Sequence, residues 1–300
     1  MSSKSVFLCL YLFCLTLFIV TPTDVKAQAG PKIKTLIIDG QNNHNWAGTT
    51  PVLKDMLEKS DRFTVEVATC KPEDTKTFGP DFSKYDLVVM NFNNDRADGR
   101  WNSITERAFE KFVADGGGLV VYHAADNSFP SWKAYNEMCA IGGWGGRNEK
   151  SGPYLYWENG KPVRNPASGS GGHHGPQWEF LIEVRTPEHP IMKGMPQSFR
   201  HAKDELYDFM RGPAENVTIL ATAFANTSHG GSGRHEPQLL AIDFGKGRVF
   251  HTCLGHDVPQ IKSVSFIATF LRGAEWAATG KVTIPVPEDM PGTEKPVYRE

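Results

Sequence analysis

The chain has 300 residues, of which 40% are hydrophobic and 22% are charged, and its formal net charge is −2 at pH 7. A chain of this size and composition buries a sizeable core and forms one α/β domain near the upper end of the usual length. The balanced charge, with no basic patch and no Arg-rich tract, argues against a nucleic-acid partner and suits a small uncharged ligand.

The first residues have the pattern of a signal peptide. Lys4 gives a positive start, and residues 6–20 form an uncharged run that is too short to span a membrane. The small residue Ala27 suits cleavage by a signal peptidase. We therefore expect residues 1–27 to be removed, which leaves a secreted or periplasmic protein with no membrane attachment.

In the first half of the chain, short apolar runs alternate with helical patterns. Pro51 indicates the start of a helix, and Ser103 with Glu106 forms a capping box for a second helix that ends at Gly116. This β-α-β order predicts an α/β fold with a parallel sheet covered by helices. The expected strands here are 33–39, 63–68, 87–92 and 118–123.

Regular patterns stop between residues 124 and 178, a stretch rich in Gly and Trp. We expect it to be an elaborated loop region over the carboxyl edge of the sheet. One domain is assigned to residues 28–280, and the Pro-rich residues 281–300 are expected to form an extended tail. The other expected elements are strands at 180–184 and 217–223, a turn at 188–194, a hairpin of 239–244 with 248–253, and a helix at 264–277.

Histidines and carboxylates follow the ends of several expected strands. Ligands of open α/β sheets bind outside the carboxyl ends of the strands, so such residues meet at one site although they lie far apart in sequence. A buried structural histidine or a surface salt-bridge cluster is the alternative for each of them. The candidate catalytic residues are His256, His123, Glu205, His44 and Asp126.

The segment Asp39-Gly-Gln-Asn-Asn-His-Asn-Trp46 follows the first strand and is dense in amides. Amides hold sugar hydroxyls, and aromatic rings stack on sugar faces. The alternatives are a helix-capping loop for this segment, a solvated Gly-rich loop around residue 173, and ordinary packing for each aromatic ring. The candidate substrate-binding residues are Gln41, Asn42, Asn43, Trp46, Trp144, His173, His174 and Tyr207.

A mononuclear metal site is a further reading of the same residues. His44, His123, His256 and Glu205 are ligand types that zinc and manganese accept, although no short motif of the His-Glu-x-x-His kind is present. The cofactor therefore stays open between none and a divalent metal. The thiols expected outside the signal peptide form either one disulfide with a free thiol or three unpaired core cysteines; they are Cys70, Cys139 and Cys253.

The segments LIIDGQNNHNW, YDLVVMNFN, FVADGGGLVVYHAADNSF, EHPIMKGMP, DELY and GKGRVFHTCLGHD occur in this order. Over residues 33–280 the chain resembles the ThuA-like, trehalose-utilisation family. The resemblance implies the flavodoxin-like fold of class I glutamine amidotransferases, with a mostly parallel sheet, helices on both faces and a single domain. An amidotransferase carries its thiol nucleophile where this chain has His123 and Ala124, so glutaminase activity is not expected.

The resemblance also implies a role in the breakdown of glycosides or 3-keto-glycosides, such as trehalose-type disaccharides. A 3-keto group acidifies the proton on carbon 2, which His256 or His123 would remove while Glu205 orients the base. A metal or the amides of Asn42 and Asn43 would stabilise the enolate. The partner expected is a small carbohydrate, and a homo-oligomer is left open.

Three other functions stay open at this point. A non-catalytic sugar-binding protein would use the same amides and aromatic rings without turnover. A partner-assembly domain of another secreted enzyme would need no small ligand. An ordinary two-carboxylate glycosidase ranks low, because no matched pair of carboxylates follows the strands.

Overall fold

The computed structural model describes residues 31–96 and 98–300. The expected signal peptide falls outside these residues and stays a prediction. In the described residues, no helix has both the length and the apolar character that crossing a membrane requires.

One half of the central sheet is parallel. Its strands lie in the order β2-β1-β3-β4-β13, each paired in parallel with its neighbours. This is the order of flavodoxin-like folds, in which the chain reverses direction across the sheet beside β1. The strands are β1 (Ile33–Asp39), β2 (Phe63–Thr69), β3 (Leu87–Met90), β4 (Gly118–Tyr122) and β13 (Gly247–Thr252).

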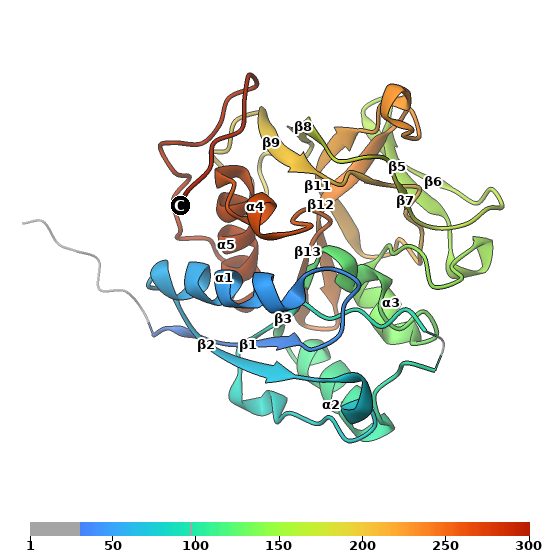
Figure 1. Cartoon of the computed structure of the whole chain (residues 1–300), viewed down its shortest axis with the longest axis vertical. Coiled ribbons are helices and arrows are strands. Elements are labelled where there is room, and N and C mark those ends of the chain that lie inside the picture. The colour runs from blue at the N-terminus through green and yellow to red at the C-terminus, as the bar shows by residue number, and fades with distance from the viewer. Residues whose placement is uncertain (1–30, 97) are drawn as a thin grey trace, which may run out of the picture. The chain divides into compact units, whose positions relative to one another are not determined.

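Antiparallel strands extend the sheet beyond β13 in the order β12-β11-β8-β9, and the hairpin β5-β6 pairs with β12. A separate two-stranded sheet joins β7 to β10. Figure 1 shows this extension beside the parallel half. The strands are β5 (Tyr154–Glu158), β6 (Lys161–Asn165), β7 (His173–His174), β8 (Trp178–Val184), β9 (Ser198–Asp204), β10 (Tyr207–Asp208), β11 (Val217–Phe224) and β12 (His235–Phe244).

Helices cover both faces of the sheet, which divides the core into two clusters. On one face α1 (Trp46–Lys59) and α5 (Val264–Thr279) pack against alternate strand residues, and on the other α2 (Ser103–Ala114) and α3 (Lys133–Cys139) pack against the residues between them. The flavodoxin-like fold is confirmed. The short helices are η1 (Pro72–Asp74), η2 (Phe82–Lys84), η3 (His123–Asn127), η4 (Glu149–Ser151), η5 (Thr227–His229) and α4 (Val258–Ile261).

Both expected helix starts were wrong. Helix α1 begins at Trp46 because the Asn45 side chain accepts the Gly48 N–H, so Pro51 lies inside the helix. The side chain of Asn102, not Ser103, caps α2 by accepting the N–H groups of the second and third helical residues. Amide side chains cap both helices, whereas the sequence patterns had pointed to Pro and Ser.

Three other expectations need correction. The stretch 124–178 is not only loop, since it holds α3 and the β5-β6 hairpin. Strand β9 was missed because its polar residues resemble a surface cluster. Strand β4 ends at Tyr122, so His123 is the first residue of η3.

The C-terminal residues and the cysteines have defined places. Residues 281–300 contain no helix or strand, and Val297 and Gly292 accept backbone N–H groups of the domain at 2.8 Å. In the described part of the chain, the thiols are unpaired and buried, as one of the two sequence alternatives predicted; they are Cys70, Cys139 and Cys253.

Candidate functional site

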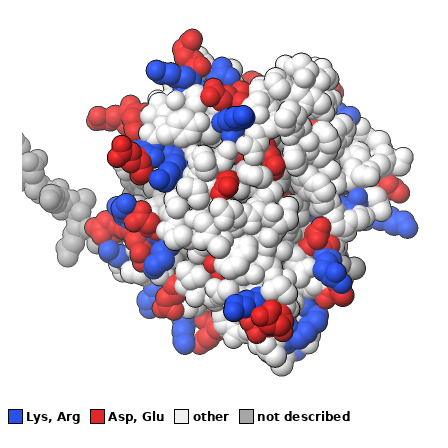
Figure 2. Space-filling view, in the orientation of Figure 1, with Lys and Arg blue, Asp and Glu red and all other residues white. Residues whose placement is uncertain are grey.

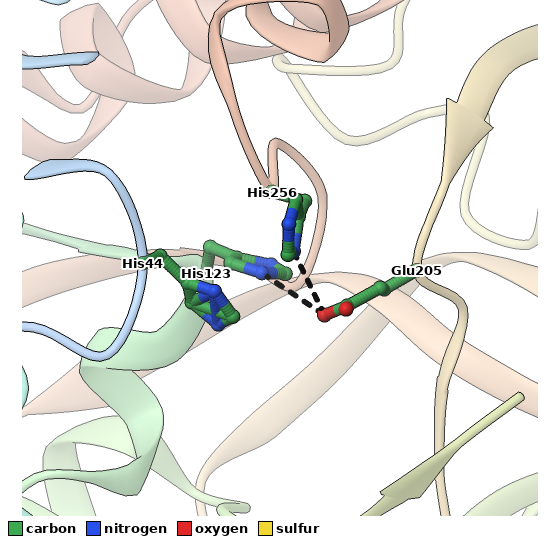
Figure 3. A group of neighbouring side chains, drawn as sticks. All are labelled: His44, His123, Glu205 and His256. Atoms are coloured by element: carbon green, nitrogen blue, oxygen red, sulfur yellow. Dashed lines mark ion pairs between the residues drawn. The ribbon is translucent and has the colours of Figure 1, made fainter. Parts of the chain in front are cut away.

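Three histidines and one glutamate meet at the carboxyl edge of the sheet. His44 follows β1, His123 follows β4, Glu205 follows β9 and His256 follows β13. One potential ligand atom from each lies within 4.8 Å of the others. Figure 3 shows the side chains turned toward one another. This group is called the His3Glu cluster below.

His123 occupies a sharp turn between β4 and η3. Its φ of 47° lies in the left-handed region, which is unfavourable for a residue with a side chain and is enriched at functional sites. The ring Nδ1 donates to the Cys253 carbonyl at 2.6 Å, which fixes the proton on that nitrogen. Nε2 therefore presents its lone pair to the cluster, 3.1 Å from the Tyr207 hydroxyl and 3.6 Å from Glu205 Oε2.

Glu205 lies at the centre of the charged contacts. Its Oε2 is 3.1 Å from His256 Nδ1, yet neither buried atom has a hydrogen-bond partner in the described residues. Burial alone would raise the pKa of Glu205, but His123 and His256 outweigh it and hold that pKa well below its usual range. The Glu205 carboxylate in turn raises the pKa of His256.

Asp204 holds the two chain segments of the cluster together. Its fully buried carboxylate accepts from the backbone N–H groups of Gly255 at 2.7 Å, His256 at 3.2 Å and Glu205 at 2.8 Å. It also pairs with His201 Nε2 at 2.8 Å. Although burial alone would raise the pKa of Asp204, these contacts lower it. Asp204 is thus an anchor that positions Glu205 and His256.

His44 stays neutral at ordinary pH. Burial, followed by the neighbouring His123 and His256, lowers its pKa to about 3. Its Nε2 lies 3.4 Å from the Tyr207 hydroxyl. A neutral imidazole keeps a lone pair that can bind a metal, whereas so low a pKa makes His44 a weak proton acceptor.

A small polar cavity opens beside the cluster, with a volume of about 210 Å³. The Trp144 and Tyr207 rings form one wall, with centroids 4.9 Å apart, and the Trp144 and His174 rings are 5.8 Å apart. The cavity and the cluster share His44, which is a cluster member, and Tyr207, whose hydroxyl contacts His44 and His123. The lining residues are Asn43, His44, Asn93, Asp95, Asn127, Trp144, His174 and Tyr207.

His174 faces the cavity with a defined tautomer. Its Nδ1 donates to the Gly175 carbonyl at 2.8 Å, so the lone pair is on Nε2. Nε2 lies 3.6 Å from Glu205 Oε1, which would stabilise the ring once it takes a proton.

Other residues that the sequence singled out make hydrogen bonds within the domain. Gln41 donates to the Cys70 carbonyl and to Thr75, and Asn42 accepts from the His44 N–H. Trp46 is the first residue of α1, and in the described chain neither it nor Gln41 nor Asn42 lines the cavity.

Two more candidates, His173 and Asp126, are not among the described residues that line the cavity. His173 Nδ1 is 2.6 Å from Asp208 Oδ1, and its ring packs against Phe209. Asp126 is fully buried and lies 3.1 Å from His251 Nε2.

Sequence reasoning missed three cavity residues. Asn93 and Asp95 come shortly after β3, and Asn127 ends η3. The rule that selected the segment after β1 applies equally to the end of β3, so the polar residues Asn93, Asn94 and Asp95 carried a usable signal. Asn93 donates to the Asn43 amide oxygen at 2.7 Å, which joins the two strand-end loops.

Lys and Arg are interspersed with Asp and Glu on the face drawn in Figure 2. Among the residues drawn in colour there, they form no continuous basic surface.

Comparison with known proteins identifies relatives. The sequence pattern of the ThuA family, described as trehalose utilisation, matches residues 34–277. A ThuA-like protein from Parabacteroides merdae is 48% identical with a TM-score of 0.86, covering 90% of this chain and 98% of its own. A ThuA-like protein from Bacteroides uniformis has the same fold at 17% identity and a TM-score of 0.58, covering 87% of this chain and 97% of its own. Comparison with curated proteins found no match. With its strand-end site and this match over most of its length, the chain belongs to the ThuA family.

Proposed function

We propose that the protein is a secreted enzyme that acts on keto-glycosides by transfer of a substrate proton to a histidine. The ThuA family is linked to trehalose utilisation, so the role is carbohydrate-related. The observation that supports the finer assignment is the cavity beside the His3Glu cluster, where amides, an indole ring and the imidazoles of His44 and His174 surround one small space.

The cavity suits a single sugar ring. Its volume of about 210 Å³ is below the roughly 300–1,000 Å³ of pockets for drug-sized ligands. The buried Oδ1 of Asn93 has no hydrogen-bond partner in the described residues and would accept from a sugar hydroxyl. The Trp144 indole offers an apolar face for ring C–H groups.

His174 is the proposed proton acceptor. It lines the cavity, whereas His123 is 2% exposed and, with His256, lies outside the lining of the cavity in the described chain. The proton-accepting role that the sequence suggested for His123 or His256 therefore passes to His174. Glu205, 3.6 Å away, would stabilise the imidazolium.

The proposed reaction is an elimination. His174 takes the proton from carbon 2, and the C–H electron pair forms an enolate with the carbon-3 carbonyl. The enolate then expels the substituent on carbon 1, which leaves with the electron pair of the glycosidic bond and takes up a proton. The Asn43 and Asn127 amides line the cavity and would hydrogen-bond the enolate oxygen.

The test is hydrogen exchange in D2O. Purified protein is incubated with 3-keto-trehalose, and NMR follows deuterium uptake at carbon 2 and release of the second sugar. We expect both. Binding of the keto-sugar without exchange would overturn the enzyme assignment and leave a sugar-binding protein.

A further inference from the structure

We propose that the His3Glu cluster binds one divalent transition-metal ion, with zinc as the best match. The proposal goes beyond the function above, because it stands whichever sugar the cavity accepts. Its basis is the geometry of His44, His123, Glu205 and His256.

The spacing of the ligand atoms fits a single ion. Zinc binds imidazole nitrogen and carboxylate oxygen at about 2.0–2.2 Å, so two ligands of a tetrahedral site lie about 3.3 Å apart. Glu205 Oε2 lies 3.1 Å from His256 Nδ1 and 3.6 Å from His123 Nε2. All four ligand atoms lie within 4.8 Å of one another.

Unpartnered atoms at the centre of the cluster also indicate a cation. Glu205 Oε2 and His256 Nδ1 are buried and close, but they do not hydrogen-bond to each other or to any described residue. A carboxylate oxygen without a partner is costly to bury. One ion between these two atoms would bind both. If they formed only an ion pair, we would expect them to be aligned for a hydrogen bond, and they are not.

The surroundings of the ligands match those of metal sites. Metal-binding histidines usually donate their second ring N–H to a carbonyl or carboxylate, which fixes the tautomer. His123 does this through Nδ1 and the Cys253 carbonyl at 2.6 Å. Asp204 fixes the backbone of both Glu205 and His256, so two ligands are positioned before any ion arrives.

The ligand types select the metal. Three imidazole nitrogens and one carboxylate oxygen suit zinc and its first-row neighbours, whereas magnesium and calcium prefer oxygen ligands. His44 also lines the cavity, so an ion held by the cluster would lie next to a bound sugar.

A second group in the described residues, Asp126, His251 and Cys253, is a poorer site. Burial raises the pKa of the Cys253 thiol well above its ordinary value, and the thiol must lose its proton to bind a metal. His251 Nε2 already hydrogen-bonds to Asp126 at 3.1 Å, whereas Glu205 Oε2 and His256 Nδ1 have no hydrogen-bond partner among the described residues. We therefore place the ion in the His3Glu cluster.

The test measures metal directly. The full chain is stripped with a chelator and titrated with Zn²⁺ and, separately, with Co²⁺, whose visible absorption reports its coordination. Bound metal is counted by elemental analysis after gel filtration. We expect about one ion per chain and an affinity at least tenfold lower in Glu205→Gln and His256→Asn.

The control is His229→Gln, which removes a histidine that stacks on Trp178 outside the cluster. Circular dichroism of the stripped variants shows whether each is folded. Failure of the folded wild type to take up Zn²⁺ or Co²⁺ would overturn the proposal, as would uptake that is equal in wild type and cluster variants. Metal binding without keto-sugar turnover would overturn only the proposed function. Turnover by the stripped enzyme with no metal uptake would overturn only the metal site.

Discussion

The carboxylate of Asp204 accepts the backbone N–H of Gly255 at 2.7 Å, which ties the end of β9 to the loop after β13. These segments carry Glu205 and His256. The distance between the Glu205 and His256 side chains therefore depends on Asp204. Asp204 does not line the cavity, and its side chain is not one of the proposed metal ligands.

Asp204→Asn tests this anchor. The variant removes a buried charge from His201 and leaves an amide N–H2 group facing backbone donors, so we expect a loss of about 3 kcal/mol in unfolding free energy. Metal affinity should fall together with stability. Urea unfolding and Co²⁺ titration measure the two effects, and Asp243→Asn, on an exposed part of β12, should change stability by less than about 0.5 kcal/mol. A stable variant with a normal cobalt spectrum would mean that Asp204 does not position the cluster.

Gly255→Ala tests the tight loop before His256. Gly255 has φ +104°, and an added Cβ would lie 2.7 Å from ring atoms of both Phe266 and Tyr122. Gly230→Ala is the matched control, with φ +79° and nothing within 4 Å of the new Cβ. We expect the Gly255 variant to lose about 1–3 kcal/mol more than the control in thermal or urea unfolding. Equal losses would show that the loop relaxes at little cost.

Glu236→Gln tests a buried carboxyl on β12. Burial raises the pKa of Glu236 to about 7. The unfolded chain loses this proton near pH 4.3, so the folded state binds more protons between these values and its stability falls as pH rises toward 7. Glutamine can still accept from Ser232 Oγ, which lies 2.7 Å from Glu236, and it does not ionise.

We therefore expect the Gln variant to be more stable than wild type by about 1–3 kcal/mol at pH 8 and nearly equal to it at pH 4. Urea unfolding at pH 4, 6 and 8 gives the comparison. A difference that does not change with pH would show that Glu236 does not titrate in this range.

His174→Gln tests the proposed base. The variant keeps a polar side chain but cannot accept a proton near neutral pH, so deuterium exchange at carbon 2 should fall by a factor of about 10²–10⁴. His173→Gln is the neighbouring control, because His173 contacts Asp208 and Phe209 outside the lining of the cavity. Exchange that falls equally in both variants would point to a general disturbance of the loop.

The parallel half of the sheet could be predicted from sequence because its strands are short segments with apolar runs, as in β3 and β4, or with alternating apolar residues, as in β2. Strand β1 occupies Ile33–Asp39, as expected, and Gly40 follows it with φ +110°. Strand β9 could not be predicted in this way, since Arg200, His201 and Lys203 interrupt its apolar pattern. Its hydrogen bonds to β8, and not its composition, make it a strand.

Some residues of the candidate site could also be predicted from sequence, and others could not. His44, His123 and His256 follow parallel strands, and the rule that ligands bind at the carboxyl edge brought them together before the structure was known. That rule also selected Asp126, but the turn of η3 carries it to His251 in the core. His174 could be named but not placed, because its position depends on the pairing of β7 with β10.

The four cluster residues are contributed by both the parallel and the antiparallel half of the sheet, and Glu205 and His256 lie late in the chain. A chain halfway through synthesis holds His44 and His123 but lacks the other two, so it offers no complete site. An ion held by all four would bind only the finished molecule. Such an ion would stabilise the native state after folding is complete. It would therefore slow unfolding and leave the rate of folding almost unchanged.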